Sequence, residues 1–167
     1  MNNPNSRRAF LRGAFTEAPL MRPYGAAPET AFRELCDGCG DCIRACRQGV
    51  LATGGGGLAF FNTARGACTF CGDCIAVCET GALAEGRAWE WRAQADASCL
   101  SRRGVQCRAC QDHCDESAIR FRLRPGGRAE PQFDTGLCTG CGGCAAPCPV
   151  ASIRFTTNPQ PTETRPC

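Results

Sequence analysis

The chain lacks lysine, contains one histidine among its 167 residues, and has no long run of apolar residues. A Rieske iron-sulfur site needs two histidine ligands, so a lone His113 excludes that kind of centre. A membrane-spanning helix needs about 18 or more consecutive apolar residues, so no membrane span is expected. The glycine run at residues 54–57 has no following lysine and indicates a turn rather than a phosphate-binding loop. No catalytic motif is present, and we do not expect an enzyme.

Large apolar side chains are also scarce. The hydrophobic fraction is 43%, but 17 of these residues are cysteines and 24 are alanines, which leaves 31 larger apolar side chains. That number makes a thin core for a chain of this length. Small metal domains compensate with ligand bonds, and metal binding is then coupled to folding. We therefore expect the chain to be largely unfolded without its cofactor.

Cysteine, by contrast, is abundant. Sixteen of the 17 cysteines fall into four groups of nearly the same spacing. Cys167 has no spaced partner, and we expect it to be a free thiol. Three groups read C-x2-C-x2-C-x3-C, the arrangement that holds 4Fe-4S clusters in bacterial ferredoxins. The group at 99–114 differs because its first gap has seven residues instead of two. The groups are Cys36, Cys39, Cys42, Cys46; Cys68, Cys71, Cys74, Cys78; Cys99, Cys107, Cys110, Cys114; and Cys138, Cys141, Cys144, Cys148.

The spacing also predicts which cysteines share a cluster. Three thiolates two residues apart let one loop wrap a face of an iron-sulfur cube, and in two-cluster ferredoxins the fourth cysteine ligates the other cluster. The motifs therefore predict two pairs and four 4Fe-4S clusters. The expected ligand sets are Cys36, Cys39, Cys42 with Cys78; Cys68, Cys71, Cys74 with Cys46; Cys99, Cys107, Cys110 with Cys148; and Cys138, Cys141, Cys144 with Cys114.

Two other uses of cysteine fit this pattern less well. Disulfide frameworks belong to short secreted chains in oxidising compartments, and the sequence shows no secretory segment. Structural zinc prefers two C-x2-C pairs separated by a longer span. A third cysteine after two more residues, as in the regular groups, is not the zinc pattern.

Net positive charge is confined to the N-terminal segment. Residues 1–28 contain four arginines and one glutamate, whereas the other 15 arginines are balanced by 15 acidic residues. An oxidised cluster with its four thiolates carries about −2, so four clusters add about −8 and make the rest of the protein acidic. Nucleic-acid binding, which needs a basic face, is therefore not expected.

The N-terminal arm, residues 1–31, contains the string Ser6-Arg7-Arg8-Ala9-Phe10-Leu11-Arg12, which looks like a twin-arginine export signal. A working signal also needs an apolar stretch after the arginines. Charged residues and prolines interrupt the segment that follows, so we expect a cytoplasmic protein. Arg7 and Arg8 are then candidates for partner binding, and the alternative is a solvated tail without a role.

The motifs recur with a period that indicates a repeated unit, because their third cysteines lie at positions 42, 74, 110 and 144. Turn residues at 53–57, 85–86 and 125–127 separate short strand-forming segments and predict three hairpins. A short helix is expected at 42–46. Together these features predict an α+β fold of two tandem ferredoxin-like dicluster modules with few regular elements.

We place these modules at residues 32–94 and 95–157, followed by a flexible tail at 158–167. The boundary falls at 92–97, a segment without strand alternation. Trp89 and Trp91 precede it, and we expect both to pack over a cluster or between the modules, with a partner contact as the alternative.

The widened third motif is the most distinctive segment of the chain. Its gap places Arg102 and Arg103 in a loop beside a cluster. Nearby positive charge raises a cluster's reduction potential, and added exposure changes its access to a partner. Arg102 and Arg103 are therefore candidate partner-binding residues, and the alternative is a tolerated insertion.

Several features together resemble the NapF family over about residues 6–156. They are the string S-R-R-x-x-L-x-G, the order of the four motifs, the widened gap, the run Cys107–Cys114, and Pro149-Val150 after the last motif. The resemblance implies a cytoplasmic ferredoxin-type accessory protein. Such a protein meets the catalytic subunit of periplasmic nitrate reductase before export and assists maturation of its cluster. One departure from the ferredoxin pattern is that Cys148 alone among the fourth cysteines precedes a proline.

Cysteine spacing by itself is equally consistent with a second function. The chain could be a polyferredoxin that carries electrons between redox partners, or an electron-transfer subunit of an oxidoreductase. The arginine-containing arm and the widened third motif favour the accessory role.

Overall fold

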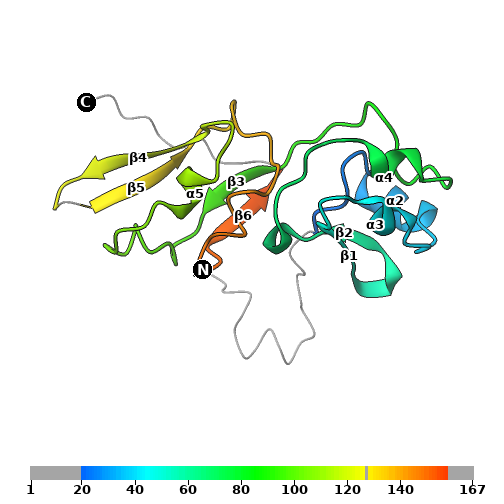
Figure 1. Ribbon diagram of the computed structural model, residues 1–167, viewed down its shortest axis with the longest axis horizontal. Helices are drawn as coiled ribbons and strands as arrows, with labels where there is room; N and C mark the ends of the chain where they lie inside the picture. The colour runs from blue at the N-terminus through cyan, green and yellow to red at the C-terminus, as the bar shows by residue number, and fades with distance from the viewer. Residues whose placement is uncertain (1–19, 127, 158–167) are drawn as a thin grey trace.

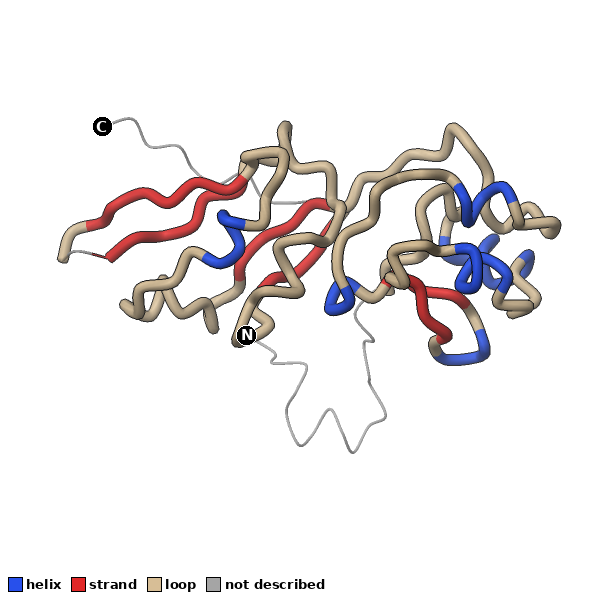
Figure 2. The backbone as a smooth tube through the Cα atoms, in the orientation of Figure 1, coloured by secondary structure: helices blue, strands red, loops and turns tan. Residues whose placement is uncertain are grey.

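The computed structural model describes residues 20–126 and 128–157. Figure 1 shows two halves along the long axis, one around β1 and β2 and the other around β3 to β6. Short helices and strands are joined by long loops (Figure 2), which is the α+β architecture with few regular elements that the sequence predicts. Arg7, Arg8, Cys167 and the tail at 158–167 lie outside the described residues.

The first half contains three short helices, α2 (Glu29–Leu35), α3 (Asp41–Ala45) and α4 (Asp73–Ala76), and one hairpin. Strand β1 (Leu51–Thr53) pairs antiparallel with β2 (Ala59–Phe61) across the glycine turn at Gly55–Gly57, which confirms the first predicted hairpin. A second short turn of 3₁₀ helix spans Thr63–Arg65. The buried side chains of this half form two small clusters, one around Phe32 and Leu83 and one around Val50 and Phe61.

The segment before α2 is part of this half, although the sequence placed it in the arm. Arg22 is 6% exposed and pairs with Glu29 at 2.7 Å. Its guanidinium also donates to the Ala59 carbonyl at 3.0 Å and stacks over the Phe32 ring at 4.8 Å from the centroid. A buried guanidinium is stable when it is paired and hydrogen-bonded in this way. The segment that contains Arg22 therefore packs against β2 and α2 as part of the first half.

The second half contains α5 (Ala109–Asp112) and two antiparallel strand pairs. Strand β4 (Ile119–Arg124) pairs with β5 (Arg128–Phe133), which confirms the hairpin predicted around 125–127. Strand β3 (Arg92–Ala95) pairs with β6 (Ile153–Thr156). Ile119, Phe133 and Ile153 form a buried core with three cysteines, Cys99, Cys110 and Cys144.

Two sequence predictions differ from the structure. The predicted hairpin around 85–86 does not form, because Leu83 pairs with Ala26 of the N-terminal segment and the Ala27 N–H donates to the Ala82 carbonyl at 2.9 Å. The segment at 92–97, predicted to lack strand structure, includes β3. In both cases the pairing partner lies far away in sequence, where local alternation carries no signal.

Within the described ranges no helix combines the length and the apolar character needed to cross a bilayer.

Candidate metal centres

The structure gathers the cysteines into mixed sets, each with a thiol from another motif. One pocket is lined by Cys36, Cys39, Cys42 and Cys78, which we call the first site. A second pocket, the second site, is lined by Cys46, Cys68, Cys71 and Cys74. Another pocket is lined by Cys114, Cys138, Cys141 and Cys144. We call it the fourth site, because three of these cysteines belong to the fourth motif. These groupings are those that crossed ligation requires.

The crossed pairing assigns the remaining cysteines, Cys99, Cys107, Cys110 and Cys148, to one set that we call the third site. Cys99 and Cys110 are 8% exposed and belong to the buried core of the second half, against which Cys148 also packs. The Cys110 thiol interacts electrostatically with Cys99 and Cys107. The widened gap of the third motif thus still brings its first cysteine to the other two.

Burial raises the pKa of several of these thiols. Desolvation comes first among the causes, and neighbouring thiols add to it, so that the pKa of Cys42 rises to about 11 and that of Cys74 to about 12. The pKa of Cys110 rises to about 11, and that of Cys144 is raised as well, for the same reasons. Four thiolates crowded in a low-dielectric site need a compensating positive charge. Iron supplies that charge, and thiolates are its ligands in 4Fe-4S clusters.

The donor geometry distinguishes a cluster from a single ion. Among the residues described, no three His, Cys, Asp or Glu side chains lie close enough to hold one metal ion. A tetrahedral zinc site needs all four sulfurs within bonding distance of one atom. Four cysteine thiols around one pocket are the ligand set of a 4Fe-4S cluster, so the residues present fit that group.

Backbone amides donate to two of the thiols that cross between motifs. The Leu83 N–H donates to Cys78 Sγ at 3.3 Å, and the Ser152 N–H donates to Cys148 Sγ at 3.3 Å. The Ser152 hydroxyl lies 3.3 Å from the same sulfur. Burial would raise the pKa of Cys148, but these hydrogen bonds outweigh it and lower the pKa. Hydrogen bonds to ligand sulfurs tune the potential of iron-sulfur clusters.

Left-handed glycines shape three of the four ligand loops. Gly40 and Gly72 follow the second cysteine of their motifs with φ of 77° and 83° and stand at the N-caps of α3 and α4. Gly142 has φ of 90° at the corresponding position of the fourth motif. In the third motif this position is Arg108, whose φ is −135° and whose guanidinium lies 5.5 Å from the Phe121 ring centroid. The third loop therefore differs in backbone path as well as in length.

The loop at 100–106 is held by the β4–β5 hairpin. Ser101 is 4% exposed, and its hydroxyl donates to the Ala129 carbonyl of β5. Arg102 and Arg103 are both exposed. His113 is exposed too, with its Nδ1 3.0 Å from the Ala109 carbonyl oxygen.

The loop and the hairpin carry an excess of exposed arginines, of which the sequence indicated Arg102 and Arg103. Within residues 101–128 seven arginines are exposed, against three exposed acidic residues, Asp112, Asp115 and Glu116. Alternation along a strand places the arginines of β4 on one face, a signal that could have been read from the sequence. We call the exposed arginines of the loop at 100–106 and of the hairpin the basic face; they are Arg102, Arg103, Arg120, Arg122, Arg124 and Arg128. Arg124 is paired with Glu130 at 3.0 Å, and Arg108 lies over Phe121 on the opposite side of β4.

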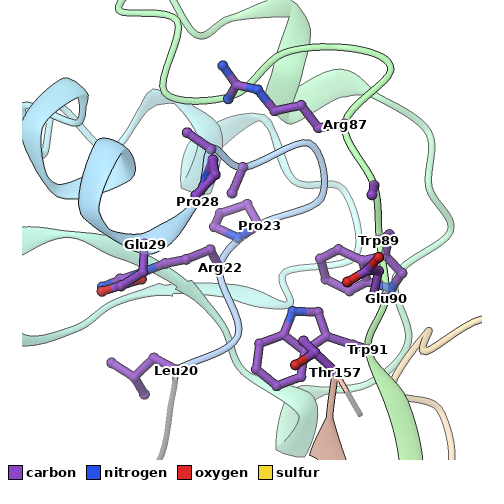
Figure 3. A pocket seen from close by; sticks show the side chains of 13 residues that line it. Leu20, Arg22, Pro23, Pro28, Glu29, Arg87, Trp89, Glu90, Trp91 and Thr157 are labelled. Atoms are coloured by element: carbon purple, nitrogen blue, oxygen red, sulfur yellow. The ribbon is translucent and has the colours of Figure 1, made fainter.

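Aromatic side chains cover the second site. Trp89 lies in edge-to-face contact with Tyr24 and Phe70, with ring centroids 5.9 Å apart in each case. All three rings line the pocket of the second site. Trp89 and Trp91 also line a groove of about 470 Å³, together with residues of the N-terminal segment and Thr157. Figure 3 shows these side chains around it. Trp89 thus packs over a candidate cluster site, whereas Trp91 lines the groove but not the pocket of the second site.

Comparison with known proteins agrees with this geometry. The profile of a 4Fe-4S dicluster domain matches residues 29–83, and a second 4Fe-4S dicluster profile matches residues 104–152. The ferredoxin-type protein NapF of Escherichia coli K12 is 38% identical over 151 residues, which cover 89% of this chain and 92% of the relative. NapF of Haemophilus influenzae is 36% identical over 160 residues, which cover 88% and 91%. No solved structure matches the chain. Two tandem dicluster domains and this identity over nearly the whole chain show that the protein belongs to the NapF family of ferredoxin-type 4Fe-4S proteins.

Proposed function

We propose that the protein is a cytoplasmic accessory protein that binds four 4Fe-4S clusters and assists maturation of the 4Fe-4S cluster of the periplasmic nitrate reductase catalytic subunit before export. The membership in the NapF family carries this proposal. The sixteen motif cysteines take the ligand role in the crossed sets described above. Each bound cluster supplies a store of iron and sulfide and a one-electron redox centre. The chain itself holds, shields or exposes that cluster.

The two halves expose their ligands to different degrees, which supports a division of labour. Cys39 of the first site and Cys71 of the second site are exposed. In the second half, Cys99, Cys110 and Cys144 are buried. Ligand exchange between proteins needs an incoming thiolate to reach the cluster, and reaction of cysteine sulfur depends on such access. We infer that the first half presents the clusters that take part in maturation and that the second half retains its own.

The basic face is the proposed docking surface for the partner. Its arginines are all exposed and lie on the loop at 100–106, which precedes Cys107, and on the β4–β5 hairpin. Arginine forms planar, bidentate contacts with carboxylates, so a surface of this kind suits an acidic patch on a protein. Opposite charges also speed association at low salt. Arg102 and Arg103 therefore belong to the partner-binding surface.

The proposal is tested by cluster transfer. Protein loaded with ⁵⁷Fe is mixed anaerobically with the apo catalytic subunit of periplasmic nitrate reductase, the two are separated, and Mössbauer spectra are recorded. We expect labelled 4Fe-4S signal in the catalytic subunit. Arg102→Ser with Arg103→Ser should slow the transfer, and the slowing should diminish at high salt.

A matched control separates docking from general charge effects. Arg33 and Arg154 are also exposed, with side-chain fractions of 58% and 57%, and lie outside the basic face. Changing both to serine removes the same charge and should leave transfer unchanged. If iron never moves or forms in the catalytic subunit while the reduced protein passes electrons to a redox partner, the protein is an electron carrier and the maturation proposal fails.

A further inference from the structure

The groove beside Trp89 and Trp91 is lined mainly by apolar side chains and lies open in the described part of the chain. Leu20 is 40% exposed, and Pro28 is exposed as well. Figure 3 shows Pro23 and the two indoles around the open space. The groove's volume of about 470 Å³ falls within the range of about 300–1,000 Å³ that is usual for ligand sites. A short apolar segment of polypeptide is a ligand of suitable size.

The arginines that line the groove are already bound within its walls. Arg22 is paired with Glu29 at 2.7 Å. The guanidinium of Arg87 donates to the Ala82 carbonyl at 2.7 Å and to the Gly81 carbonyl at 3.0 Å. These cations therefore need no charged ligand, and the groove suits an uncharged occupant.

The pairing of β3 with β6 brings the end of the described chain to this groove. Arg92 lies opposite Thr156 in the register, so the next pair of residues outward is Trp91 and Thr157. Both of these residues line the groove. Ten residues follow Thr157 in the sequence, and the first four read Asn-Pro-Gln-Pro, at 158–161. The C-terminal tail therefore starts at the wall of the groove.

The sequence of this tail suits an aromatic groove. Asn158 and Gln160 each precede a proline, which favours extended or polyproline II conformations at both residues. Grooves lined by aromatic side chains bind polyproline II segments, because such segments lose little entropy on binding. With Thr162 the uncharged run has a length of about 15 Å at about 3.1 Å per residue. The N-terminal arm also adjoins the groove, at Leu20, but it carries a charge close by, at Glu17.

We propose that residues 158–162 of the C-terminal tail occupy this groove and cover the indoles of Trp89 and Trp91. Trp89 also lines the pocket of the second site, so the docked tail adds a layer over the aromatic cover of that site. Because the segment belongs to the same chain, its effective concentration is on the order of millimolar, and weak contacts are sufficient to hold it. This docking does not depend on the maturation role.

The two tryptophans of the chain provide the test, because both line the groove. Cluster-loaded, oxidised protein is labelled with 5-fluorotryptophan and examined anaerobically by ¹⁹F NMR, with Trp91→Phe to assign the signals. The intact chain is compared with a chain that ends at Thr157. A synthetic peptide of residues 158–167, carrying Cys167→Ser so that it cannot bind iron, is then added to each.

We expect truncation to shift the Trp91 signal and the peptide to restore it, with no effect of the peptide on the intact chain. A peptide with Pro159→Gly and Pro161→Gly is the matched control and should lose binding. Identical spectra from the intact and truncated chains, or equal binding of the peptide to both, would overturn the proposal. A shift produced by removal of residues 1–19 instead of the tail would assign the groove to the arm and would also overturn it.

A second measurement uses the full-length chain and keeps the proposal falsifiable if the truncated chain does not take up clusters. Pro159→Gly with Pro161→Gly should release the tail and increase the change in the Trp91 ¹⁹F shift between H₂O and D₂O, which grows with solvent exposure. Pro166→Gly lies outside the docked segment and should leave this solvent effect as it is in the wild type. An equal solvent effect in all three proteins would show that the tail does not cover Trp91.

Discussion

Replacing Gly140 by alanine should lower the free energy of unfolding by more than the cost of a left-handed backbone conformation alone. Gly140 has φ of 73°, and its Cβ would clash with the Trp91 carbonyl oxygen and lie 2.9 Å from Trp89 Nε1. A left-handed conformation costs an alanine roughly 1–2 kcal/mol. Overpacking against a backbone atom adds about 1–3 kcal/mol. The sum of these costs is about 2–5 kcal/mol of unfolding free energy for Gly140→Ala.

Gly126→Ala is the matched control for this prediction. Gly126 has φ of 84° in the turn between β4 and β5, and nothing lies within 4 Å of its Cβ position. This variant carries the conformational cost alone, about 1–2 kcal/mol. The measurement is denaturant unfolding of the loaded protein under anaerobic conditions, with iron content checked for each variant and midpoints compared at equal slope. Equal destabilisation by the two variants would refute the close packing of the fourth loop on the first half.

Three further predictions concern single side chains. Phe32→Ala empties a site that is 1% exposed and should lower the free energy of unfolding by about 3–5 kcal/mol, whereas Phe32→Leu should cost less in the same denaturant assay. A hydrogen bond to Arg22 lowers the pKa of Glu29 from 4.5 to about 2. The contribution of this ion pair to stability is therefore fully present above pH 4.5 and is lost as pH falls towards 2. The difference in melting temperature between wild type and Glu29→Gln should shrink over that window, and a constant difference would contradict the pairing. Ser152→Ala removes the hydroxyl at Cys148 and should lower the midpoint potential of one cluster in a redox titration, with Ser98→Ala as the unshifted control.

Local signals in the sequence were sufficient to predict some of the secondary-structure elements. The hairpins β1–β2 and β4–β5 are closed by glycine turns between short strand-forming segments, and both form where expected. Helix α2 was missed although the signals are present: Pro28 precedes it, and Glu29 and Arg33 form an i,i+4 pair at 2.6 Å. The helix begins at Glu29, inside the segment at 1–31 that the sequence assigned to the arm.

Other features depend on partners that are remote in sequence. Strand β3 reads Arg-Ala-Gln-Ala, which contains no β-branched or aromatic residue, and it forms because β6 lies beside it. The hydrogen bond from the Cys68 N–H to the Cys141 carbonyl oxygen, at 2.7 Å, has no signature in either motif. Cysteine spacing predicts which thiols a loop can gather, but it says nothing about which sites face each other between modules.

We propose that the sixteen motif cysteines hold four 4Fe-4S clusters. The most direct test is iron and acid-labile sulfide analysis of anaerobically prepared protein, combined with Mössbauer spectroscopy. We expect about sixteen irons and as many sulfides per chain, with all iron in cubane clusters. Stable protein with iron for two clusters, or with zinc in place of iron, would contradict it.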